Sequence, residues 1–423
     1  MSEAVVIIGA GPAGLGAGLG LADQGLVLEG SPHPGGLCRT IELDGAFFDF
    51  GGHSFHTPHP EVRDLVFRSL DMVEQPRNAW CYVGGDWVPY PFQKHFEGLR
   101  DPALREECRR APAKTSGPPP ANFDDYLERR FGPGVCRRFL RPYNQKLWGE
   151  DLTRLAVEWA GERVAGPAGS REQFVSDGGR RTPLQDDTHV AYPAHGGFGA
   201  ILDALARQVP RLRLGQEVAQ IDPRRRQLVT GRGHVVSWRH IVSTLPLPHL
   251  LRLLPDVPPA IRESAARLEA LPLALVLVVL GRPAETDMQR IYCAGPEIPA
   301  HKIVVNHNSS PSLRALPQHG IQAEVARPGS RSDTELIGQV LDGLRTLGLL
   351  RAGEAARTTR VIRLAAAYPV PSHGRAAAVR QIQHWLAAQG IDTVGRGGEW
   401  AYINSDEALH RGLMLGRRLA QAA

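Results

Sequence analysis

Apolar and polar positions along the chain alternate between strand-like and helix-like spacing, which is typical of an α/β protein. The chain opens with four β-branched apolar residues, Val5 to Ile8, followed by small residues and then by helical spacing. Such a continuous apolar run predicts a strand covered on both faces of a parallel sheet. A second short run, Leu26 to Leu28, predicts its neighbour. We therefore expect a strand–helix–strand unit over residues 1–60.

The next part of the chain has a different pattern. A polar, proline-rich stretch over residues 111–120 predicts a surface loop that could act as a flap. Helical spacing then runs from Asn122 to Ala165 and predicts a small helical insert. We expect breaks in this insert at Gly132–Gly134 and at Arg141–Pro142, because glycine and proline interrupt helices.

The second half returns to α/β spacing. Short strands are predicted at residues 212–214, 217–221, 227–230, 234–238 and 241–246. Longer apolar runs predict a second sheet with strands at 271–281, 301–306 and 321–326, interrupted by a loop over 309–320. Helices are predicted at 200–208, 376–389 and 406–420.

Composition and charge narrow the class of protein. A chain of 423 residues exceeds one ordinary core and suggests two or three domains, and an apolar share of 42% is typical of a globular enzyme. The formal net charge of +5 suits an anionic small ligand, but it is too diffuse for nucleic acid. We therefore expect a small-molecule substrate and no nucleic-acid partner.

Cysteine usage and hydropathy indicate a cytoplasmic protein. The five cysteines include no C-x-x-C pair, which favours reduced thiols over a disulfide framework. The first predicted strand leaves no room for a signal peptide. The longest apolar run, Ala270 to Leu280, is too short to cross a bilayer, so we expect no membrane partner.

The most informative motif joins the first strand to the first helix. Gly9, Gly11 and Gly14 form G-x-G-x-x-G at this turn. The first glycine permits the tight turn, the second lets a pyrophosphate approach the backbone, and the third lets helix and strand pack closely. Free N–H groups at the helix start attract the phosphates. Glu29 closes the second strand, where an acid can accept hydrogen bonds from an adenosine ribose, so we expect a bound dinucleotide.

Four further segments carry a resemblance to known flavoproteins. Pro34 to Arg39 follows the acid directly, as in flavin enzymes of the amine-oxidase and GDI-like superfamily. Residues 48–57 resemble the G-P-H-x-F-H-T segment of UDP-galactopyranose mutases, with Gly52 in place of the proline. Residues 143–149 resemble that family's Y-x-x-K-x-W-G helix end, and residues 395–406 resemble its G-R-x-x-x-Y-x-Y-x-D-M-D signature.

The order and approximate spacing of these segments agree over nearly the full chain. The resemblance implies an α/β fold with a Rossmann-type, GDI-like FAD-binding domain, a helical insert and a second, antiparallel-sheet substrate domain. The expected boundaries are 1–75, 186–245 and 361–423 for the FAD-binding domain, 76–185 for the mainly helical insert, and 246–360 for the substrate domain.

The same resemblance implies an unusual use of the flavin without net oxidation. Nitrogen N5 of the reduced FAD would attack the anomeric carbon of a sugar and expel a nucleoside diphosphate, and the sugar would reclose as a furanose before the diphosphate returns. The implied cofactor is reduced FAD, and the implied substrate is a nucleoside-diphosphate sugar or a related glycosyl compound. A homodimer is compatible with this family.

Matched positions imply the cofactor contacts. Gly52 and His53 would lie against the flavin ring, and Arg396 would face the FAD pyrophosphate or hold the reduced flavin as its anion. Val218 would offer backbone hydrogen bonds to the adenine. The expected cofactor-binding residues are Gly9, Gly11, Gly14, Glu29, Gly35, Gly36, Leu37, Arg39, Gly52, His53, Val218, Arg396 and Asp406.

Matched positions also imply the substrate contacts. Trp148 would stack on the uracil or sugar part of the pocket, and Tyr368 and Tyr402 would donate hydrogen bonds to diphosphate oxygens. The expected catalytic residues are His53, Trp148, Tyr368, Arg396, Tyr402 and Asn404.

The chain departs from the family pattern at three places. Where the family has T-R-I-x-E, residues 320–324 read Gly-Ile-Gln-Ala-Glu, so the arginine is missing, and Arg314 or Arg327 could supply its charge. Asn404 replaces the first aspartate of D-M-D. The segment from Gly9 to Glu29 is shorter than usual. These changes predict a different nucleotide sugar or a related glycosyl intermediate as substrate.

The sequence leaves two other functions open and also raises the question of a metal site. The first alternative is an FAD-dependent oxidase or desaturase of the same superfamily, and the second is a non-catalytic GDI-like binding protein. His53, His56 and His59 with Asp49 could suggest a metal site, but their spacing on a strand-to-loop segment does not converge, so no metal is expected.

Overall fold

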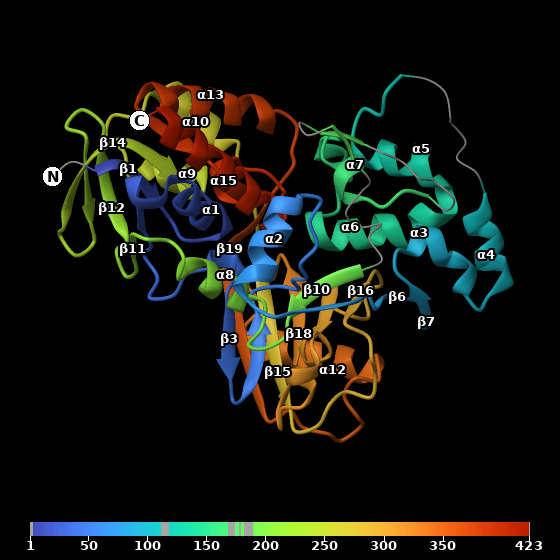
Figure 1. Ribbon diagram of the computed structural model, residues 1–423. Helices are drawn as coiled ribbons and strands as arrows, with labels where there is room; N and C mark the ends of the chain where they lie inside the picture. Colours follow the sequence, from blue (N-terminus) through green and yellow to red (C-terminus); the bar gives the residue numbers. More distant parts are fainter. Residues whose placement is uncertain (1–2, 111–117, 168–173, 177–178, 182–188, 423) are drawn as a thin grey trace.

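The computed structural model describes residues 3–110, 118–167, 174–176, 179–181 and 189–422. Figure 1 shows three parts: an α/β part that holds β1 and α15, a helical part, and a long sheet below both. Most of the predicted proline-rich loop lies outside the described residues, because these omit 111–117.

The α/β part is built on a seven-stranded sheet. Its strand order is β11-β2-β1-β14-β13-β12, with β20 also paired to β14. The strands are β1 (Glu3–Ile8), β2 (Gly25–Leu28), β11 (Leu212–Arg213), β12 (Val218–Asp222), β13 (Gln227–Thr230), β14 (Val235–Ser243) and β20 (Ile391–Thr393). β1 pairs in parallel with β2 and β14, which confirms the buried parallel strand. The separate strands predicted at 234–238 and 241–246 form one strand, β14.

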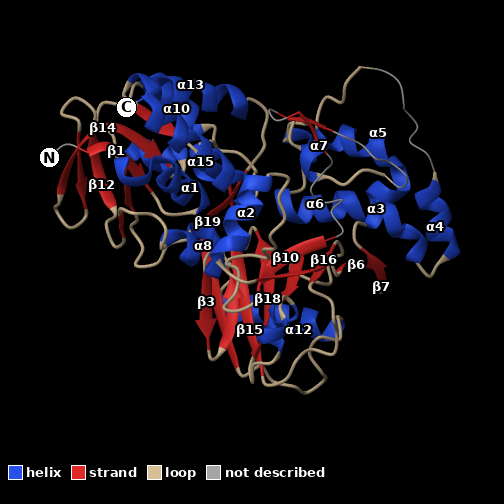
Figure 2. Ribbon diagram, viewed as in Figure 1, coloured by secondary structure: helices blue, strands red, loops and turns tan. Residues whose placement is uncertain are grey.

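Helices cover both faces of this sheet, as Figure 2 shows. Val5 and Ile7 pack among residues of α1 (Pro12–Leu21), α8 (Gly199–Ala206) and α15 (Ser405–Ala422). Val6 and Ile8 pack among residues of α9 (Leu247–Arg252), α10 (Pro259–Ala266) and α13 (Arg375–Ala388). Burial on both faces explains why every position of the first apolar run is hydrophobic.

Glycines bring α15 against α1. A Cβ atom at Gly16 would lie 2.3 Å from the Leu409 carbonyl oxygen, and one at Gly412 would lie 2.0 Å from the Ala13 carbonyl oxygen. The two helix backbones therefore pack directly on each other, without side chains between them. This packing sets the start of α15 beside the glycine turn that precedes α1.

The second sheet is long and mostly antiparallel, with the order β19-β15-β18-β17-β16-β6-β7. Its strands are β6 (Ala79–Val83), β7 (Asp86–Pro89), β15 (Ala270–Leu280), β16 (Arg290–Cys293), β17 (Lys302–Val305), β18 (His319–Ala326) and β19 (Thr358–Pro369). The three strands predicted from the longer apolar runs are confirmed as β15, β17 and β18. The loop predicted over 309–320 also contains the short helix α11 (Pro311–Arg314).

The two faces of this sheet have different neighbours. Leu273, Leu275 and Leu277 of β15 pack with the helical part, whereas Val276 and Val278 pack with α12 (Asp333–Thr346). The alternation follows the two-residue period of a strand. It leaves one face of the sheet for the helical part and for the cavity described below.

The helical part contains α3 (Phe92–His95), α4 (Pro102–Arg109), α5 (Phe123–Val135), α6 (Arg141–Trp148) and α7 (Ala160–Arg163). The break predicted at Gly132–Gly134 is confirmed, because Gly132 has φ 79° and ψ 167°, which are not helical values, inside α5. The break predicted at Arg141–Pro142 is wrong. A π-helical turn over Cys136–Leu140 leads into α6, and the Arg141 N–H donates to the Cys136 carbonyl oxygen. Pro142 therefore falls in the first turn of α6, where its missing N–H needs no partner.

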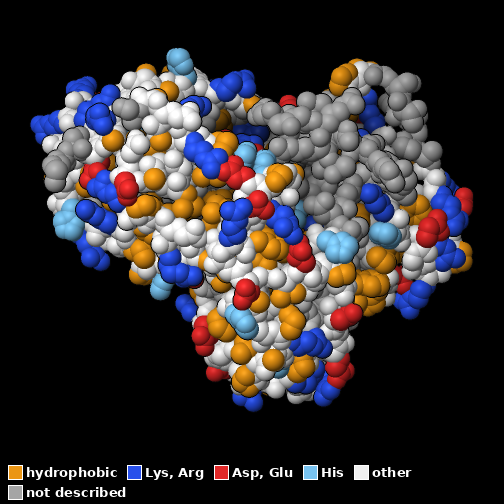
Figure 3. Space-filling view, in the orientation of Figure 1, with side chains coloured by type: hydrophobic (Ala, Val, Ile, Leu, Met, Phe, Trp, Pro, Cys, Tyr) orange, Lys and Arg blue, Asp and Glu red, His pale blue; other side chains and the backbone are white. Residues whose placement is uncertain are grey.

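The domain boundaries expected from the sequence stay predictions. β6 and β7, from the expected helical insert, pair within the antiparallel sheet. α9 and α10, which follow residue 245, pack on the α/β sheet. On the face shown in Figure 3, cationic and anionic side chains are interspersed over all three parts.

Candidate functional site

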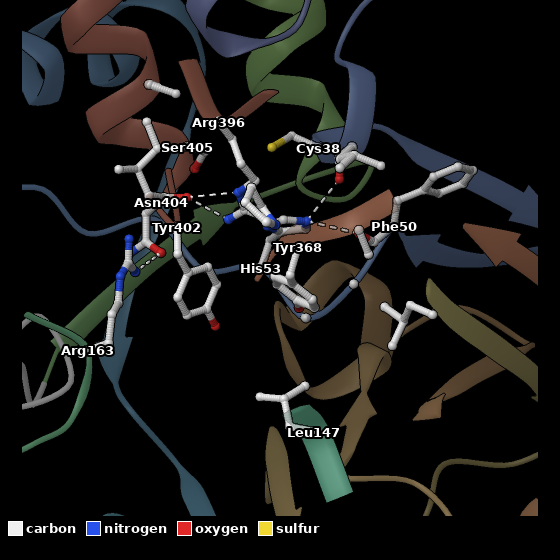
Figure 4. A pocket seen from close by; sticks show the side chains of 18 of the residues that line it. Cys38, Phe50, His53, Leu147, Arg163, Tyr368, Arg396, Tyr402, Asn404 and Ser405 are labelled. Carbon is white, nitrogen blue, oxygen red and sulfur yellow. Dashed lines mark hydrogen bonds between the residues drawn. The ribbon is translucent and has the colours of Figure 1, made fainter. Parts of the chain in front are cut away.

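A cavity of about 570 Å³ is lined by residues of all three parts. Gly9 to Ala13 and Gly395 to Gly397 come from the α/β part, Leu140 to Trp148 from the helical part, and Tyr292, Lys302 and Tyr368 from the sheet. This volume is in the range of ligand and cofactor sites. Figure 4 shows side chains from these different segments converging on it.

One wall of the cavity is backbone, and we call it the glycine wall: Gly9, Gly11, Gly36, Gly52 and Gly395. Gly9 has φ +100°, and a Cβ there would lie 2.2 Å from the Thr244 hydroxyl oxygen. A Cβ at Gly11 would meet nothing within 4 Å, so the space in front of it is open. Gly11 is also the N-cap of α1, with no side chain bonded to the free N–H groups. An elongated phosphate-bearing group can reach these donors.

Gly14 acts differently from Gly11. It does not line the cavity, and a Cβ there would lie 1.8 Å from the Gly9 carbonyl oxygen. Its role in the structure is therefore close packing of helix against turn, as the motif predicts.

Glu29 lies at the end of β2 and lines the cavity. Its two carboxylate oxygens accept hydrogen bonds from the Ala10 N–H at 2.7 Å and the Ser31 N–H at 2.8 Å. These bonds hold the carboxylate at the mouth of the glycine turn. Each oxygen keeps a lone pair that a ribose hydroxyl could use.

His53 marks the part of the glycine wall closest to the sheet. Its Nε2 lies 3.1 Å from the Leu37 carbonyl oxygen and 3.2 Å from the Phe50 carbonyl oxygen, and its ring stacks on Phe198. Burial lowers the pKa of His53 to about 4, with a further contribution from Lys302. The imidazole is therefore neutral at pH 7. Because both neighbours are acceptors, Nε2 carries the proton and donates it.

Arg396 closes a loop that carries two other predicted residues. Its Nε and Nη2 donate to the Ile403 carbonyl oxygen at 3.0 and 2.6 Å. The guanidinium carbon lies 5.4 Å from the Tyr368 ring centre and 5.7 Å from the Tyr402 ring centre. Figure 4 shows Arg396, Tyr368 and Tyr402 grouped beside His53.

Aromatic rings form the opposite side of the cavity. Trp148 lies edge-on to Tyr402 at 5.7 Å and to Tyr368 at 6.4 Å between ring centres. Burial raises the pKa of Tyr368, which therefore stays a hydroxyl donor at neutral pH. Edge-to-face packing holds these rings in fixed positions.

Asn404 has a cationic partner that the sequence did not identify. The Arg163 Nη1 donates to its Oδ1 at 2.5 Å, and the Arg163 guanidinium carbon lies 4.8 Å from the Tyr402 ring centre. Both residues line the cavity. The amide leaves the charge of Arg163 unneutralised by this contact.

The sequence reasoning missed a set of charged and aromatic residues that also line the cavity: Arg77, Arg163, Arg290, Tyr292, His301 and Lys302. They come from β-strands, a helix and loops that are far apart in the chain. The one available signal was Lys302, a lysine at the start of a predicted strand in a chain with only four lysines.

Lys302 belongs to a buried ionic cluster where the sheet meets the glycine wall at Gly52. Its Nζ lies 2.9 Å from Glu324 Oε1, and the Gly52 N–H donates to the same oxygen at 2.7 Å. His301 Nε2 lies 3.6 Å from the other Glu324 oxygen, and burial lowers the pKa of His301 to about 4. Burial tends to raise the pKa of Glu324, but Lys302 and His301 lower it overall, so the carboxylate is ionised. Glu324 thus carries the negative charge that Lys302 needs.

Five residues with expected cofactor contacts do not line the cavity: Gly14, Gly35, Arg39, Val218 and Asp406. The Arg39 guanidinium lies over the Phe50 ring at 4.3 Å, and Val218 is buried in β12 opposite Thr230. Asp406 is buried in the first turn of α15, where burial raises the pKa of its carboxyl group. None of these five residues lines the cavity, and their expected contacts with a cofactor, including the backbone contact of Val218, stay predictions.

Neither arginine proposed to replace the missing one reaches the cavity. Arg314 bonds to the Asn308 side chain and the Thr286 carbonyl oxygen, and Arg327 donates to the Trp148 carbonyl oxygen. That expectation was wrong, because both side chains are held outside the lining.

Two kinds of feature are absent from the described part of the chain. It contains no group of three or more His, Cys, Asp and Glu side chains placed to hold a metal ion. None of its helices has the length and hydropathy that crossing a bilayer requires.

Comparison with known proteins assigns the fold. The family model described as flavin-containing amine oxidoreductase matches residues 12–361. A crystal structure of reduced UDP-galactopyranose mutase is 26% identical with a TM-score of 0.87, and the alignment covers 100% of this chain and 96% of that chain.

More distant structures share the fold alone. Cyclohexylamine oxidase from Brevibacterium oxydans is 16% identical with a TM-score of 0.70, covering 100% of this chain and 99% of that chain. A fatty acid isomerase from P. acnes is 16% identical with a TM-score of 0.64, covering 98% of each. The chain therefore belongs to the flavin-containing amine oxidoreductase family, and over its whole length it is similar to UDP-galactopyranose mutase.

Proposed function

We propose that the protein is a flavin-dependent mutase that binds FAD and interconverts the pyranose and furanose forms of a nucleoside-diphosphate sugar or a close relative. The observation that carries the proposal is the pairing of two unlike walls. A glycine wall with an uncapped helix start and a wall of tyrosines, tryptophans and cations line one cavity.

The glycine wall fits FAD as the cofactor. The turn from Gly9 to Gly11 would take the pyrophosphate, and Glu29 would accept from the adenosine ribose. Gly36 and Gly52 leave room for the backbone to approach the flavin ring. When reduced, the flavin would supply a nucleophilic nitrogen to the sugar carbon.

The opposite wall fits a nucleoside diphosphate attached to a sugar. Arg163 and Lys302 offer positive charge, and Tyr368 and Tyr402 offer hydroxyl donors for phosphate oxygens. Trp148 and Trp159 offer flat apolar surface for a base or a sugar ring. His53, neutral and fixed by two carbonyl oxygens, would keep the Gly52–His53 backbone against the flavin instead of exchanging protons with substrate.

The proposal is tested with the purified holoprotein under anaerobic conditions. The sample is reduced with dithionite and incubated with UDP-, dTDP-, GDP- and ADP-sugars, and the products are separated by anion-exchange chromatography and identified by NMR. We expect furanose and pyranose forms of one nucleotide sugar to interconvert with no net change in flavin oxidation state. Equal conversion by flavin-free protein would reject the mechanism.

An FAD-dependent oxidoreductase is the second candidate, because the family model is that of amine oxidoreductases and cyclohexylamine oxidase shares the fold. An oxidoreductase would consume one equivalent of an electron acceptor per product, whereas a mutase would not. Oxygen uptake with the same substrate panel and with primary amines separates the two. A sample without flavin absorbance would instead favour the non-catalytic binding protein.

A further inference from the structure

The position of the missing arginine does not face the cavity in this protein. Ile321, Ala323 and Val325 of β18 pack with α12 on the far face of the sheet. The alternate residues Gln322 and Glu324 lie on the other face, and both are fully buried. A longer cationic side chain at position 321 would point into the α12 layer, so the positive charge for the substrate must come from another strand.

The neighbouring strand places a lysine on the cavity side. Lys302 pairs with Glu324 in the β17–β18 ladder, lines the cavity, and has a side chain that is 13% exposed. A Cβ at Gly52 would lie 3.3 Å from the Lys302 Cε and 3.3 Å from the Arg290 Nε. Lys302 and Arg290 therefore both lie next to Gly52.

Lys302 keeps hydrogen-bonding capacity that the protein does not use. An ammonium group has three donors, and the structure pairs Lys302 only with Glu324 among the described residues. Lys146 is the contrast, because its Nζ donates to the carbonyl oxygens of Cys293, Gly295 and Ile298 at 2.9, 2.5 and 2.8 Å. Lys146 is fully used in holding a loop, whereas two donors of Lys302 remain for a ligand.

The surrounding charge favours an anion at Lys302. Burial lowers the pKa of Lys302, but the Glu324 carboxylate outweighs it and raises the pKa above its usual value, so the ammonium stays protonated. Arg290 is 6% exposed and hydrogen-bonds only the His53 carbonyl oxygen, with no carboxylate within salt-bridge distance among the described residues. Asp49 also acts on Arg290, and Arg77 adds a third cation, so Lys302, Arg290 and Arg77 stand against the carboxylates Glu324 and Asp49. The cations outnumber the carboxylates beside the cavity, and buried charge of this kind calls for a counter-ion.

We propose that Lys302 binds a phosphate oxygen of the substrate's diphosphate beside Tyr368, and so replaces the arginine missing from β18. Tyr368 lines the same cavity as Lys302, and its hydroxyl would offer the second donor to the same group. In the proposed reaction, the sugar carbon would bond to the nitrogen of reduced flavin as its bond to the phosphate oxygen breaks, and the electron pair of the broken bond would stay on the phosphate. A fixed cation there stabilises that developing charge. This assignment rests on the proposed function, because it takes a nucleoside diphosphate as the leaving group.

The test compares three variants of the holoprotein. Lys302→Met removes the charge at similar length, Lys302→Arg restores it, and Lys94→Met removes one lysine charge from α3, outside the cavity lining. UDP, dTDP, GDP, ADP and UMP are titrated by calorimetry. We expect Lys302→Met to weaken binding of the preferred diphosphate about ten- to a hundredfold, with UMP changed less. Lys302→Arg should recover most of the affinity, and Lys94→Met should match wild type.

The outcomes separate this assignment from the proposed function. If wild type binds none of the diphosphates, the proposed function itself fails. If wild type binds one of them and Lys302→Met binds it equally well, the lysine assignment alone is overturned. A Lys302→Met protein with unchanged diphosphate affinity but a shifted flavin reduction potential would place the lysine on the cofactor and also overturn it. Should Lys302→Met not fold, Lys302→Gln, which can still bond Glu324, gives the same decision.

Discussion

The two walls of the cavity are built by different means. The glycine wall presents backbone from short local turns around Gly11, Gly36, Gly52 and Gly395. The other wall, which we call the side-chain wall, presents long side chains from helices, a strand and a loop that are distant in sequence, such as Trp148, Arg163, Lys302 and Tyr402.

The difference teaches which changes each wall can tolerate. A backbone wall depends on the absence of side chains, so any added atom blocks either the fold or the ligand. A side-chain wall can exchange one cation for another on a neighbouring strand, provided that a counter-charge such as Glu324 accompanies it. The comparison predicts that substrate preference varies at the side-chain wall while the cofactor site stays constant.

The largest effect is expected from Gly14→Val. The added side chain would begin 1.8 Å from the Gly9 carbonyl oxygen, so helix and turn cannot keep their packing. We expect a loss of at least about 3 kcal/mol in the free energy of unfolding, and little soluble flavoprotein. The matched control is Gly11→Ala, where the Cβ meets nothing within 4 Å. It should match the melting temperature of flavin-free wild type and lose flavin on purification. Normal flavin content there would contradict the pyrophosphate assignment.

Arg396→Ala is expected to have the next largest effect. Its guanidinium ties the loop to the Ile403 carbonyl oxygen and lies beside both tyrosines of the side-chain wall. We expect flavin to be lost on dilution or turnover to fall about a hundredfold. Flavin content is read from absorbance, and turnover from the interconversion assay. Wild-type flavin content and turnover in this variant would show that Arg396 is needed neither for flavin binding nor for the reaction.

Acid should weaken the protein through its buried histidines. Burial lowers the pKa values of His53, His301 and His307 to about 4, below the ordinary value of 6.5. Between pH 6.5 and 4 the unfolded chain binds more protons, so the free energy of unfolding falls as pH drops through this window. Each histidine contributes up to about 1.4 kcal/mol per pH unit. Urea unfolding at pH 7, 6 and 5 measures the slope, and His307→Gln should reduce it. A flat profile would mean that these rings are protonated in the fold.

The smallest effect is expected from Asn404→Asp. A carboxylate would form an ion pair with Arg163, which the present amide does not neutralise. We expect the affinity for the preferred nucleoside diphosphate to fall about three- to tenfold, with flavin content unchanged. Calorimetry with UDP and the other diphosphates measures the change. Tighter binding in the variant would contradict a role for the Arg163 charge at the side-chain wall.

Local spacing explains the glycine wall, whereas the predicted members of the side-chain wall that line the cavity, Trp148, Tyr368 and Tyr402, came from the family resemblance alone. Gly9, Gly11 and Glu29 lie in one strand–turn–helix–strand unit, so spacing alone brings them together. Lys302 and Arg163 reach the cavity through the pairing of β17 with β18 and through the position of α7 against the loop at Asn404. No local pattern encodes those contacts.

The misassigned residues have the same explanation. Arg314 and Arg327 are close in sequence to the missing arginine, but a side chain's direction depends on strand register and on local hydrogen bonds, which place both outside the cavity. The predicted break at Pro142 was wrong because a π-helical turn leads into α6 and places the proline in the first turn of that helix. Sequence spacing does not reveal such a turn.

One oxygen atom of Glu324 accepts both the Gly52 N–H and the Lys302 ammonium. The two walls are thus joined at a single atom, although Gly52 lies in a loop that is far in sequence from β17 and β18. A chimera could combine the antiparallel sheet of one relative with the α/β part of another. Such a chimera will have to take the Gly51–His53 loop from the same parent as β17 and β18.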